Sequence, residues 1–161
     1  MGRPCPKGPG NGEVMQASRG SYAGDLDVGD VWKALEQEPD AVLVDVRTTV
    51  EWSTIGVPDL RSIGKEPVLI EWQTAPTMEV NPRFLDDLQA EFERRGIRRD
   101  APVYFLCRSG VRSQFAAIAA TGNGFQAAYN VAGGFEGPPG PDGRRGTVDG
   151  WQAAGLPWTR G

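Results

Sequence analysis

The segment at residues 102–120 constrains the fold of this chain more than any other. Residues 103–106 form a short apolar run of β-favouring types, which predicts a buried strand. Residues 114–120 are rich in helix formers and carry apolar side chains at helical spacing, namely Phe115, Ile118 and Ala119. A strand, a loop and a helix in direct succession are typical of α/β folds, and strands alternating with helices along the rest of the chain favour a mainly parallel sheet.

The loop between that strand and that helix begins at Cys107 and ends at Arg112 and Ser113. A cysteine at the carboxyl end of a strand, facing the start of the next helix, lies where backbone N–H groups and the helix dipole favour an anion. Arg108 and Arg112 add positive charge, and Gly110 allows the backbone to curl so that N–H groups point inward. Such surroundings lower a thiol pKa from ~8.5 to about 3.5–7.5. Cys107 is therefore a candidate thiolate nucleophile.

The alternative is that Cys107 is an inert core residue, because free cysteine is among the most buried residue types. A core thiol would react slowly and only at high pH. However, two arginines, a glycine and two serines follow within six positions, which is a poor continuation of a core. The composition of the loop therefore favours the reactive thiol.

Residues 107–113 resemble the active-site loop of the rhodanese (thiosulfate sulfurtransferase) family. Two further stretches resemble that family in the same order: residues 45–52 upstream, and residues 132–137 with residues 151–157 downstream. The resemblance covers a whole domain, roughly residues 22–158. It implies a single-domain, three-layer rhodanese-like fold with about five strands in a mainly parallel sheet and helices on both faces.

The resemblance also implies a sulfurtransferase in which Cys107 carries a sulfane sulfur as a persulfide. The loop residues expected to bind the substrate or persulfide are Arg108, Ser109, Gly110, Val111, Arg112 and Ser113. The expected donor is thiosulfate or a persulfide and the acceptor a thiol or cyanide, with a sulfur-carrier protein as a further partner. We expect no metal and no cofactor. No general base is expected either, since a thiolate is both the attacking and the leaving group.

Asp45, Arg47 and Glu51 are expected to support the site from the end of a strand at residues 41–46, because ligands bind at this edge of α/β sheets. We expect Arg47 to pair with Glu51, four residues on, and to fasten the adjoining loop. Direct substrate contact by Asp45 and Arg47 is the alternative. Where the family continues with Gly-His-Ile-Pro-Gly, residues 55–59 read Ile-Gly-Val-Pro-Asp, so no role that needs an imidazole is carried over.

Two connections attract attention because of their length or composition. Residues 71–81 form a longer connection than a minimal family member needs, and Trp72 is expected either to line the pocket or to anchor the core. Residues 138–147 are rich in Pro and Gly, which predicts a mobile loop. Arg144 and Arg145 in that loop are interpreted as solubilising charges, with a recruitment patch for an acidic partner as the alternative.

The remaining elements follow from periodicity and from helix-ending residues. They are a strand near residues 22–24, a helix capped by Asp27 with Val28, Val31, Trp32 and Leu35 inward, a strand at 67–70, a helix from Pro82 to Gly96, a strand at 127–131, and a short helix within 151–158.

Composition sets outer limits on function. The 161 residues suffice for one domain, and a net charge of −4 argues against nucleic acid or an anionic membrane as the partner. No apolar run approaches the ~20 residues of a membrane span. Histidine is absent, which excludes Cys–His and Ser–His–Asp hydrolases and histidine metal sites. Two distant cysteines do not make a disulfide framework, so we expect a cytoplasmic protein.

Residues 1–20 are dense in Gly and Pro and are expected to form a disordered tail, which leaves residues 21–161 as the domain. Cys5 in this tail is interpreted as a bystander, with a relay thiol as the alternative. Met15 is a second candidate for the natural start.

Two other functions remain open. A Cys-based phosphatase or arsenate reductase also needs an anion cradle, but the phosphatase loop is one residue longer. Four residues between Cys107 and Arg112 suit a single sulfur atom better than a tetrahedral phosphate. A non-catalytic rhodanese-like module that carries a persulfide or binds a partner is the second alternative, although such modules usually lack the cysteine.

Overall fold

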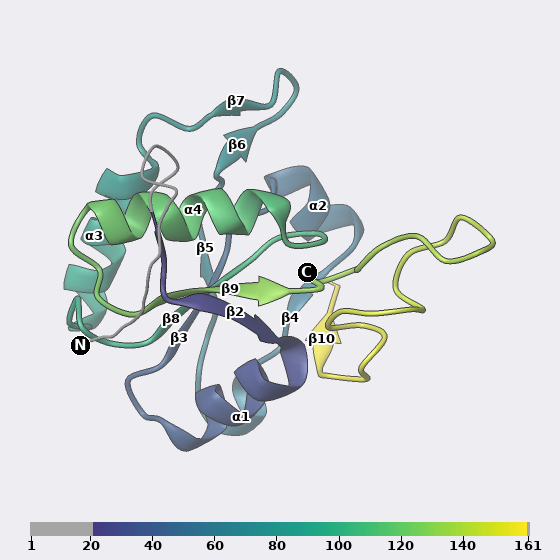
Figure 1. The fold of residues 1–161 in the computed structure, drawn as a ribbon, viewed down its shortest axis with the longest axis horizontal. Coiled ribbons are helices and arrows are strands. Elements are labelled where there is room, and N and C mark those ends of the chain that lie inside the picture. Colours follow the sequence, from purple (N-terminus) through teal and green to yellow (C-terminus); the bar gives the residue numbers. More distant parts are fainter. Residues whose placement is uncertain (1–20, 161) are drawn as a thin grey trace.

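A computed structural model describes residues 21–160, so the expectations for Cys5, Met15 and the N-terminal tail lie outside the described residues. The fold is organised around a five-stranded sheet in which every neighbouring pair is parallel (Figure 1). The strand order is β2-β9-β8-β3-β5. The strands are β2 (Gly24–Asp27), β3 (Val42–Asp45), β5 (Val68–Leu69), β8 (Val103–Leu106) and β9 (Ala128–Ala132). The predicted α/β class and five-stranded parallel sheet are confirmed.

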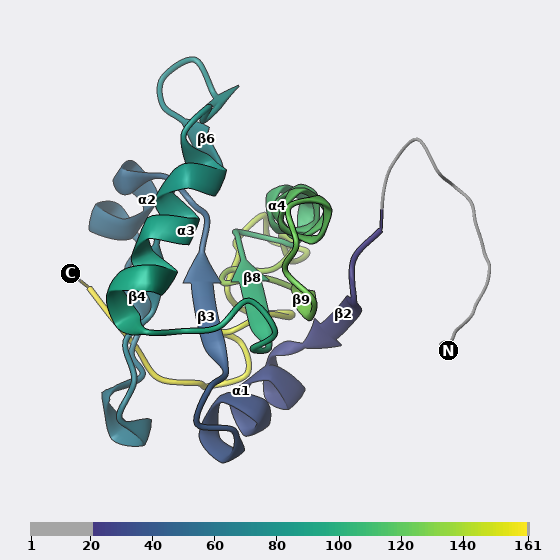
Figure 2. The same ribbon diagram turned by 90° about the vertical axis from the view of Figure 1, so that its left-hand side faces the viewer.

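Helices cover both faces of this sheet, which gives three layers (Figure 2). Helix α1 (Val28–Gln37) packs on one face, and α3 (Phe84–Arg95) and α4 (Val111–Gly122) pack on the other. Each face has its own apolar cluster, one containing the inward residues of α1 and the other those of α3 and α4.

Strand β8 lies in the middle of the sheet and contributes to both clusters, because successive side chains of a strand point to opposite faces. Val103 and Phe105 face α3 and α4, whereas Tyr104 and Leu106 face α1. Cys107 follows in the same alternation and belongs to the cluster on the α4 side. The strand period therefore directs this thiol towards the start of α4.

The ends of two helices are formed as the sequence predicts. Asp27 caps α1, and its carboxylate accepts the backbone N–H of Asp30 at 2.8 Å. Gly96 ends α3 in the left-handed conformation, with φ +70°. Acidic residues lie in the first turn of α3 and basic residues in its last turn, which suits the helix dipole.

Helix α4 differs from the prediction in both its start and its inward face. It begins at Val111, one turn before Gln114, because Gly110 adopts φ +109° and turns the chain directly into the helix. Phe115 is 54% exposed. The buried face consists of small residues, which allow the helix to lie close to β8 and β9: Ser113, Ala116, Ala117 and Ala120.

The long connection at residues 71–81 contains a hairpin of β6 (Gln73–Thr74) and β7 (Glu79–Val80), which projects beyond the sheet (Figure 1). Three short elements connect β3 to β5 along the chain: helix α2 (Thr49–Thr54), strand β4 (Val57–Pro58) and a 3-10 turn (Arg61–Ile63).

Two predicted boundaries are wrong. The first strand is Gly24–Asp27 rather than residues 22–24, because its pairing with β9 begins at Gly24. Residues 151–158 form turns instead of a short helix, and the chain then ends the described region in β10 (Trp158–Thr159), antiparallel to β4. Trp151 fixes these turns, since it is buried and its indole N–H donates to the carbonyl of Pro157 at 2.6 Å.

Candidate active site

The candidate site lies at the carboxyl edge of the sheet, where Cys107 follows β8 and leads within three residues into α4. Cys107 is buried, with 1% of its surface exposed. Its Sγ accepts the backbone N–H of Gly110 at 3.1 Å and lies 3.2 Å from Oγ of Ser113. The thiol thus occupies the base of a short loop at the N-terminus of a helix, which is a favourable position for an anionic sulfur.

A second glycine-rich turn braces this loop from outside. The backbone N–H of Phe135 donates to the carbonyl of Cys107 at 2.8 Å, and the next two amides both donate to the carbonyl of Arg108 at 3.0 Å. A Cβ on Gly134 would lie 2.5 Å from the carbonyl carbon of Arg108, so only glycine permits this approach. Residues 133–135 therefore pass directly beside the Cys107 loop.

Arg112 closes the far side of the loop through an ion pair with α2. Its two terminal nitrogens donate to the two carboxylate oxygens of Glu51, at 2.7 and 3.0 Å. Glu51 also completes a capping box with Thr48 at the start of α2. The expected pairing of Arg47 with Glu51 is therefore wrong, because Glu51 is already engaged across the site.

This pairing governs the charge state of both groups. Burial alone would raise the pKa of Glu51, but the hydrogen bonds and charge of Arg112, with the N–H of Thr48, hold it at about 2. Burial alone would lower the pKa of Arg112, but Glu51 and the charge of Cys107 raise it instead. Both groups therefore stay ionised at neutral pH, and the guanidinium of Arg112 is bound to a carboxylate rather than open to a substrate.

Arg47 pairs with Asp45, two residues before it. Its Nε and Nη2 bind both carboxylate oxygens at 2.7–3.2 Å, and Nη2 also donates to the carbonyl of Gly56. The guanidinium lies 4.1 Å above the ring of Phe135, and both Asp45 and Arg47 are fully buried. The two residues fasten the loops under the site and do not reach its surface.

Arg108 is exposed and forms no ion pair with any residue in the range 21–160, so it is the cation of the loop that faces solvent. Val111 is also exposed, and Ser109 is half-buried. Trp72 is half-buried and packs edge-to-face on Phe84, with 5.0 Å between ring centroids. Of its two expected roles, this packing matches the core anchor.

Sequence reasoning missed two residues that the structure connects to the thiol. Oγ of Ser113 lies 2.6 Å from Oδ1 of Asn130, and Nδ2 of Asn130 donates to Oδ1 of Asp25 at 2.9 Å. Asn130 is 4% exposed in the middle of β9. A polar amide inside an otherwise apolar strand was the signal available for Asn130, because buried polar groups need partners.

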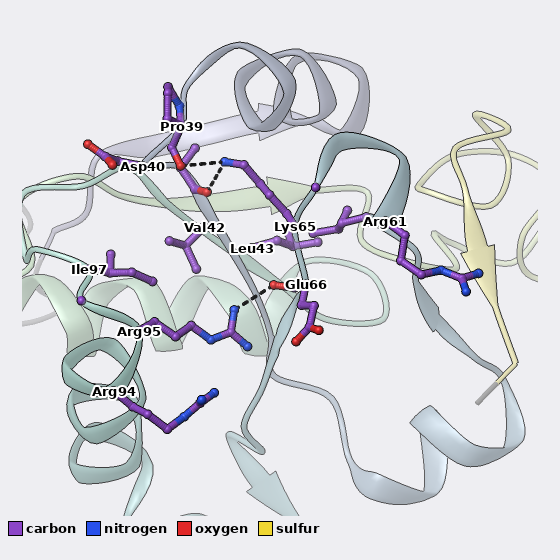
Figure 3. Close-up of a pocket in the computed structure, with 14 residues that line it drawn as sticks. Pro39, Asp40, Val42, Leu43, Arg61, Lys65, Glu66, Arg94, Arg95 and Ile97 are labelled. Carbon is purple, nitrogen blue, oxygen red and sulfur yellow. Dashed lines mark hydrogen bonds between the residues drawn. The ribbon is translucent and has the colours of Figure 1, made fainter.

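A cavity of about 650 Å³ lies at the opposite edge of the sheet, among the residues before β3 and β5 and after α3 (Figure 3). The ammonium of Lys65 donates to the carbonyls of Glu38 and Ala41, at 2.8 and 2.6 Å. Arg95 donates to the carbonyl of Glu66, and Arg61 is paired with Asp59. These cations bind carbonyl and carboxylate groups of the protein itself, so this cavity offers less chemistry than the Cys107 loop.

Within residues 21–160 no cluster of three or more His, Cys, Asp or Glu side chains could hold a metal ion. Over the same residues, no helix has both the length and the apolar character needed to cross a bilayer.

The chain is similar to several known proteins. The family model of the STR4 middle domain matches residues 26–161. An uncharacterized protein of Rickettsia conorii is 36% identical over 119 residues, which is 74% of this chain and 83% of that protein. The chloroplastic rhodanese-like domain-containing protein 4 of Arabidopsis thaliana is 28% identical over 80% of this chain, but this covers only 24% of the plant protein.

Two further matches are a solved structure with a similar fold and a relative whose name states an activity. The crystal structure of Rv0390 from M. tuberculosis has 50% sequence identity and a TM-score of 0.78, and the match covers 88% of this chain and 100% of that one. The adenylyltransferase and sulfurtransferase MOCS3 of Oryza sativa subsp. japonica is 35% identical over 66% of this chain and 22% of its own length.

Proposed function

Because this chain belongs to the rhodanese superfamily, we propose that it is a sulfurtransferase that moves a sulfane sulfur through a persulfide on Cys107. One observation carries the proposal. Sγ of Cys107 lies at the base of a short loop, 3.1 Å from the N–H of Gly110 and at the N-terminus of α4. The name sulfurtransferase borne by the rice relative supports the same chemistry.

In the first step the Cys107 thiolate attacks the outer sulfur of thiosulfate. A new S–S bond forms on Sγ, the S–S bond of thiosulfate breaks, and sulfite leaves with the bonding pair. A persulfide donor reacts in the same way and leaves as a thiolate. The terminal sulfur of the Cys107 persulfide is anionic, and inward N–H groups of the loop can stabilise that charge.

In the second step an acceptor thiolate or cyanide attacks the terminal sulfur. The S–S bond on Cys107 breaks, the sulfur leaves on the acceptor, and the Cys107 thiolate returns. No general base is needed, and the two half-reactions predict ping-pong kinetics.

The two loop arginines have different roles in this scheme. Arg108 is exposed and lacks a carboxylate partner within the described residues, so it attracts an anionic donor to the loop. Arg112 is held by Glu51 and maintains the shape of the loop.

The test compares thiosulfate-to-cyanide sulfur transfer by the wild-type chain and by Cys107→Ser, with Cys5→Ser as the matched control. Mass spectrometry of donor-treated protein then looks for one added sulfur on the Cys107 peptide. We expect activity and adduct to be lost with Cys107→Ser and retained with Cys5→Ser. If neither thiosulfate nor a persulfide donor loads Cys107, the proposed function is wrong.

The same experiment separates the alternatives. A Cys107 adduct without turnover would identify a persulfide carrier that hands its sulfur to a protein acceptor. Hydrolysis of a phosphate ester, or reduction of arsenate, by a chain that takes up no sulfur would identify a Cys-based phosphatase or arsenate reductase.

A further inference from the structure

A row of side-chain hydrogen bonds connects the thiol to the edge strand of the sheet. Oγ of Ser113 lies 3.2 Å from Sγ of Cys107 and 2.6 Å from Oδ1 of Asn130. Nδ2 of Asn130 donates to Oδ1 of Asp25 at 2.9 Å, across the β2–β9 pair in which these two residues are in register. We call Cys107, Ser113, Asn130 and Asp25 the thiol relay.

The relay is closed at its outer end by two more side chains. The hydroxyl of Tyr22 lies 3.0 Å from both carboxylate oxygens of Asp25, and Nε2 of Gln114 donates to the Tyr22 oxygen at 2.7 Å. Burial raises the pKa of Tyr22 and the charge of Asp25 adds to this, although the bond from Gln114 acts the other way. Tyr22 is therefore a protonated donor at neutral pH, and the carboxylate is held in place.

The direction of each hydrogen bond follows from what each group can do. An ionised carboxylate only accepts, so Asp25 fixes the amide of Asn130 with Nδ2 outward and Oδ1 towards Ser113. An amide oxygen also only accepts, so the single hydroxyl proton of Ser113 is donated to Asn130. While that proton lies on the shorter bond to Asn130, Oγ of Ser113 faces Cys107 with its lone pairs and accepts the S–H; Ser113 can donate to Sγ only by giving up its bond to Asn130.

We infer that Asp25 and Asn130 are positioning residues that hold the Ser113 hydroxyl as an acceptor for the Cys107 S–H, and so favour the thiol over the thiolate. The inference concerns the nucleophile of the proposed function and rests on it for its catalytic meaning. When the S–H bond breaks and the proton passes to water, the electron pair stays on sulfur. Ser113 must then rotate its proton from Asn130 to Sγ, which leaves a buried amide oxygen without a donor.

Other groups near the sulfur act in the opposite sense or are neutralised. The N–H of Gly110 donates to Sγ in either state. Arg112 on α4 interacts electrostatically with Cys107, but it is paired with Glu51 of α2. Asp45 and Arg47 at the end of β3 are paired with each other. The relay is therefore the part of the site that opposes ionisation, and Gly110 is the part that favours it.

The test measures alkylation of Cys107 by iodoacetamide as a function of pH, in a Cys5→Ser background so that one thiol remains. Asp25→Ala frees the amide of Asn130 to flip and lets Ser113 donate to the sulfur. We expect the midpoint of the alkylation profile to move to lower pH by about one unit, the scale of one hydrogen bond to a charged group. Asn130→Ala is the second variant and should shift the midpoint in the same direction.

Two comparisons separate the relay from a loss of charge or of structure. Asp86→Ala removes an equivalent exposed carboxylate from α3 and should leave the midpoint unchanged. Asp25→Ala in a Ser113→Ala background should add no shift, because the effect passes through the hydroxyl. A shift that persists without Ser113, or an unchanged midpoint in both Asp25→Ala and Asn130→Ala, would overturn the inference. The measurement needs no sulfur donor, so its failure is distinct from that of the proposed function.

Discussion

Two arginine–carboxylate pairs lie under and beside the Cys107 loop, and they differ in almost every physical respect. Asp45 and Arg47 are two residues apart and have no exposed side-chain surface. Glu51 and Arg112 are 61 residues apart and keep 19% and 16% of their side-chain surface exposed. The first pair is made within one strand end, whereas the second joins α2 to α4 and exists only when the whole domain has folded.

This difference indicates which pair mainly stabilises the fold and which mainly shapes the site. A fully buried ion pair adds little stability over apolar packing of the same volume. Removing one partner is costly, however, because the other charge is then left buried and unpaired. Breaking a partly hydrated, bidentate arginine–carboxylate pair costs less stability. Its two parallel hydrogen bonds fix the geometry of the two side chains more than they add to the free energy of folding. We therefore expect Asp45–Arg47 to dominate stability and Glu51–Arg112 to dominate loop geometry.

Arg47→Met is the strongest test of that division. It leaves the Asp45 carboxylate buried without a partner, so we expect a loss of about 3–5 kcal/mol in the free energy of unfolding, measured by urea denaturation. The double variant Asp45→Leu/Arg47→Met removes both charges and should recover most of that loss. Equal instability of the single and double variants would show that Arg47 acts mainly through Gly56 and Phe135.

Acid titration tests the second pair. Folding lowers the pKa of Glu51 from 4.5 to about 2, so its contribution to stability is complete above pH 4.5 and is lost as pH falls through 2. A shift of that size corresponds to about 3 kcal/mol. We expect the pH dependence of unfolding in this window to be weaker by that amount in Glu51→Gln. If the two curves run parallel, Glu51 does not bind Arg112 in solution.

Arg112→Lys keeps the positive charge of the second pair but removes the guanidinium that makes two parallel hydrogen bonds to Glu51. We expect a modest loss of stability of about 1 kcal/mol. The kcat/KM for sulfur transfer should fall by about tenfold or more, since small displacements at a reacting centre are costly. The measurement is steady-state kinetics beside a urea curve. A large loss of stability with unchanged kcat/KM would reverse the roles assigned to the two pairs.

Arg108→Ala sharpens the comparison with an arginine that lacks a carboxylate partner among residues 21–160. We expect stability within about 0.5 kcal/mol of wild type. The KM for thiosulfate should rise about threefold to tenfold, and the difference should shrink at high salt. Arg98→Ala, at the other end of β8, is the matched control and should leave KM unchanged. An equal KM in both variants would remove Arg108 from donor capture.

The parts of the fold that the sequence predicts are those set by neighbouring residues. The apolar period of residues 28–35, the left-handed glycine after α3 and the strand–loop–helix order around Cys107 depend on local sterics and burial, so the sequence pattern predicts them. The start of α4 was missed because Gly110 turns the chain into the helix without a side-chain cap. Periodicity also could not show that small residues, rather than Phe115, would face the sheet.

The candidate site divides in the same way. Cys107 and its loop could be predicted because they are contiguous. The partner of Glu51 could not, since a spacing of four residues pointed to Arg47 and only the tertiary fold brings Arg112 into reach. Asn130 and Asp25 lie on two different strands, and their connection to the thiol requires the register of β2 against β9.

Among residues 21–160, strand β2 is the outermost strand of the sheet on its side, and β9 is the strand with which it pairs. Edge strands open more readily than central ones, so amide hydrogens there exchange through small local fluctuations rather than global unfolding. Asp25 lies on this strand, so each local opening of β2 would break the hydrogen bond between its carboxylate and Asn130. With the relay acting as we infer, the reactivity of the Cys107 sulfur would depend on local opening of β2, and a ligand that holds β2 closed would favour the protonated thiol without touching it.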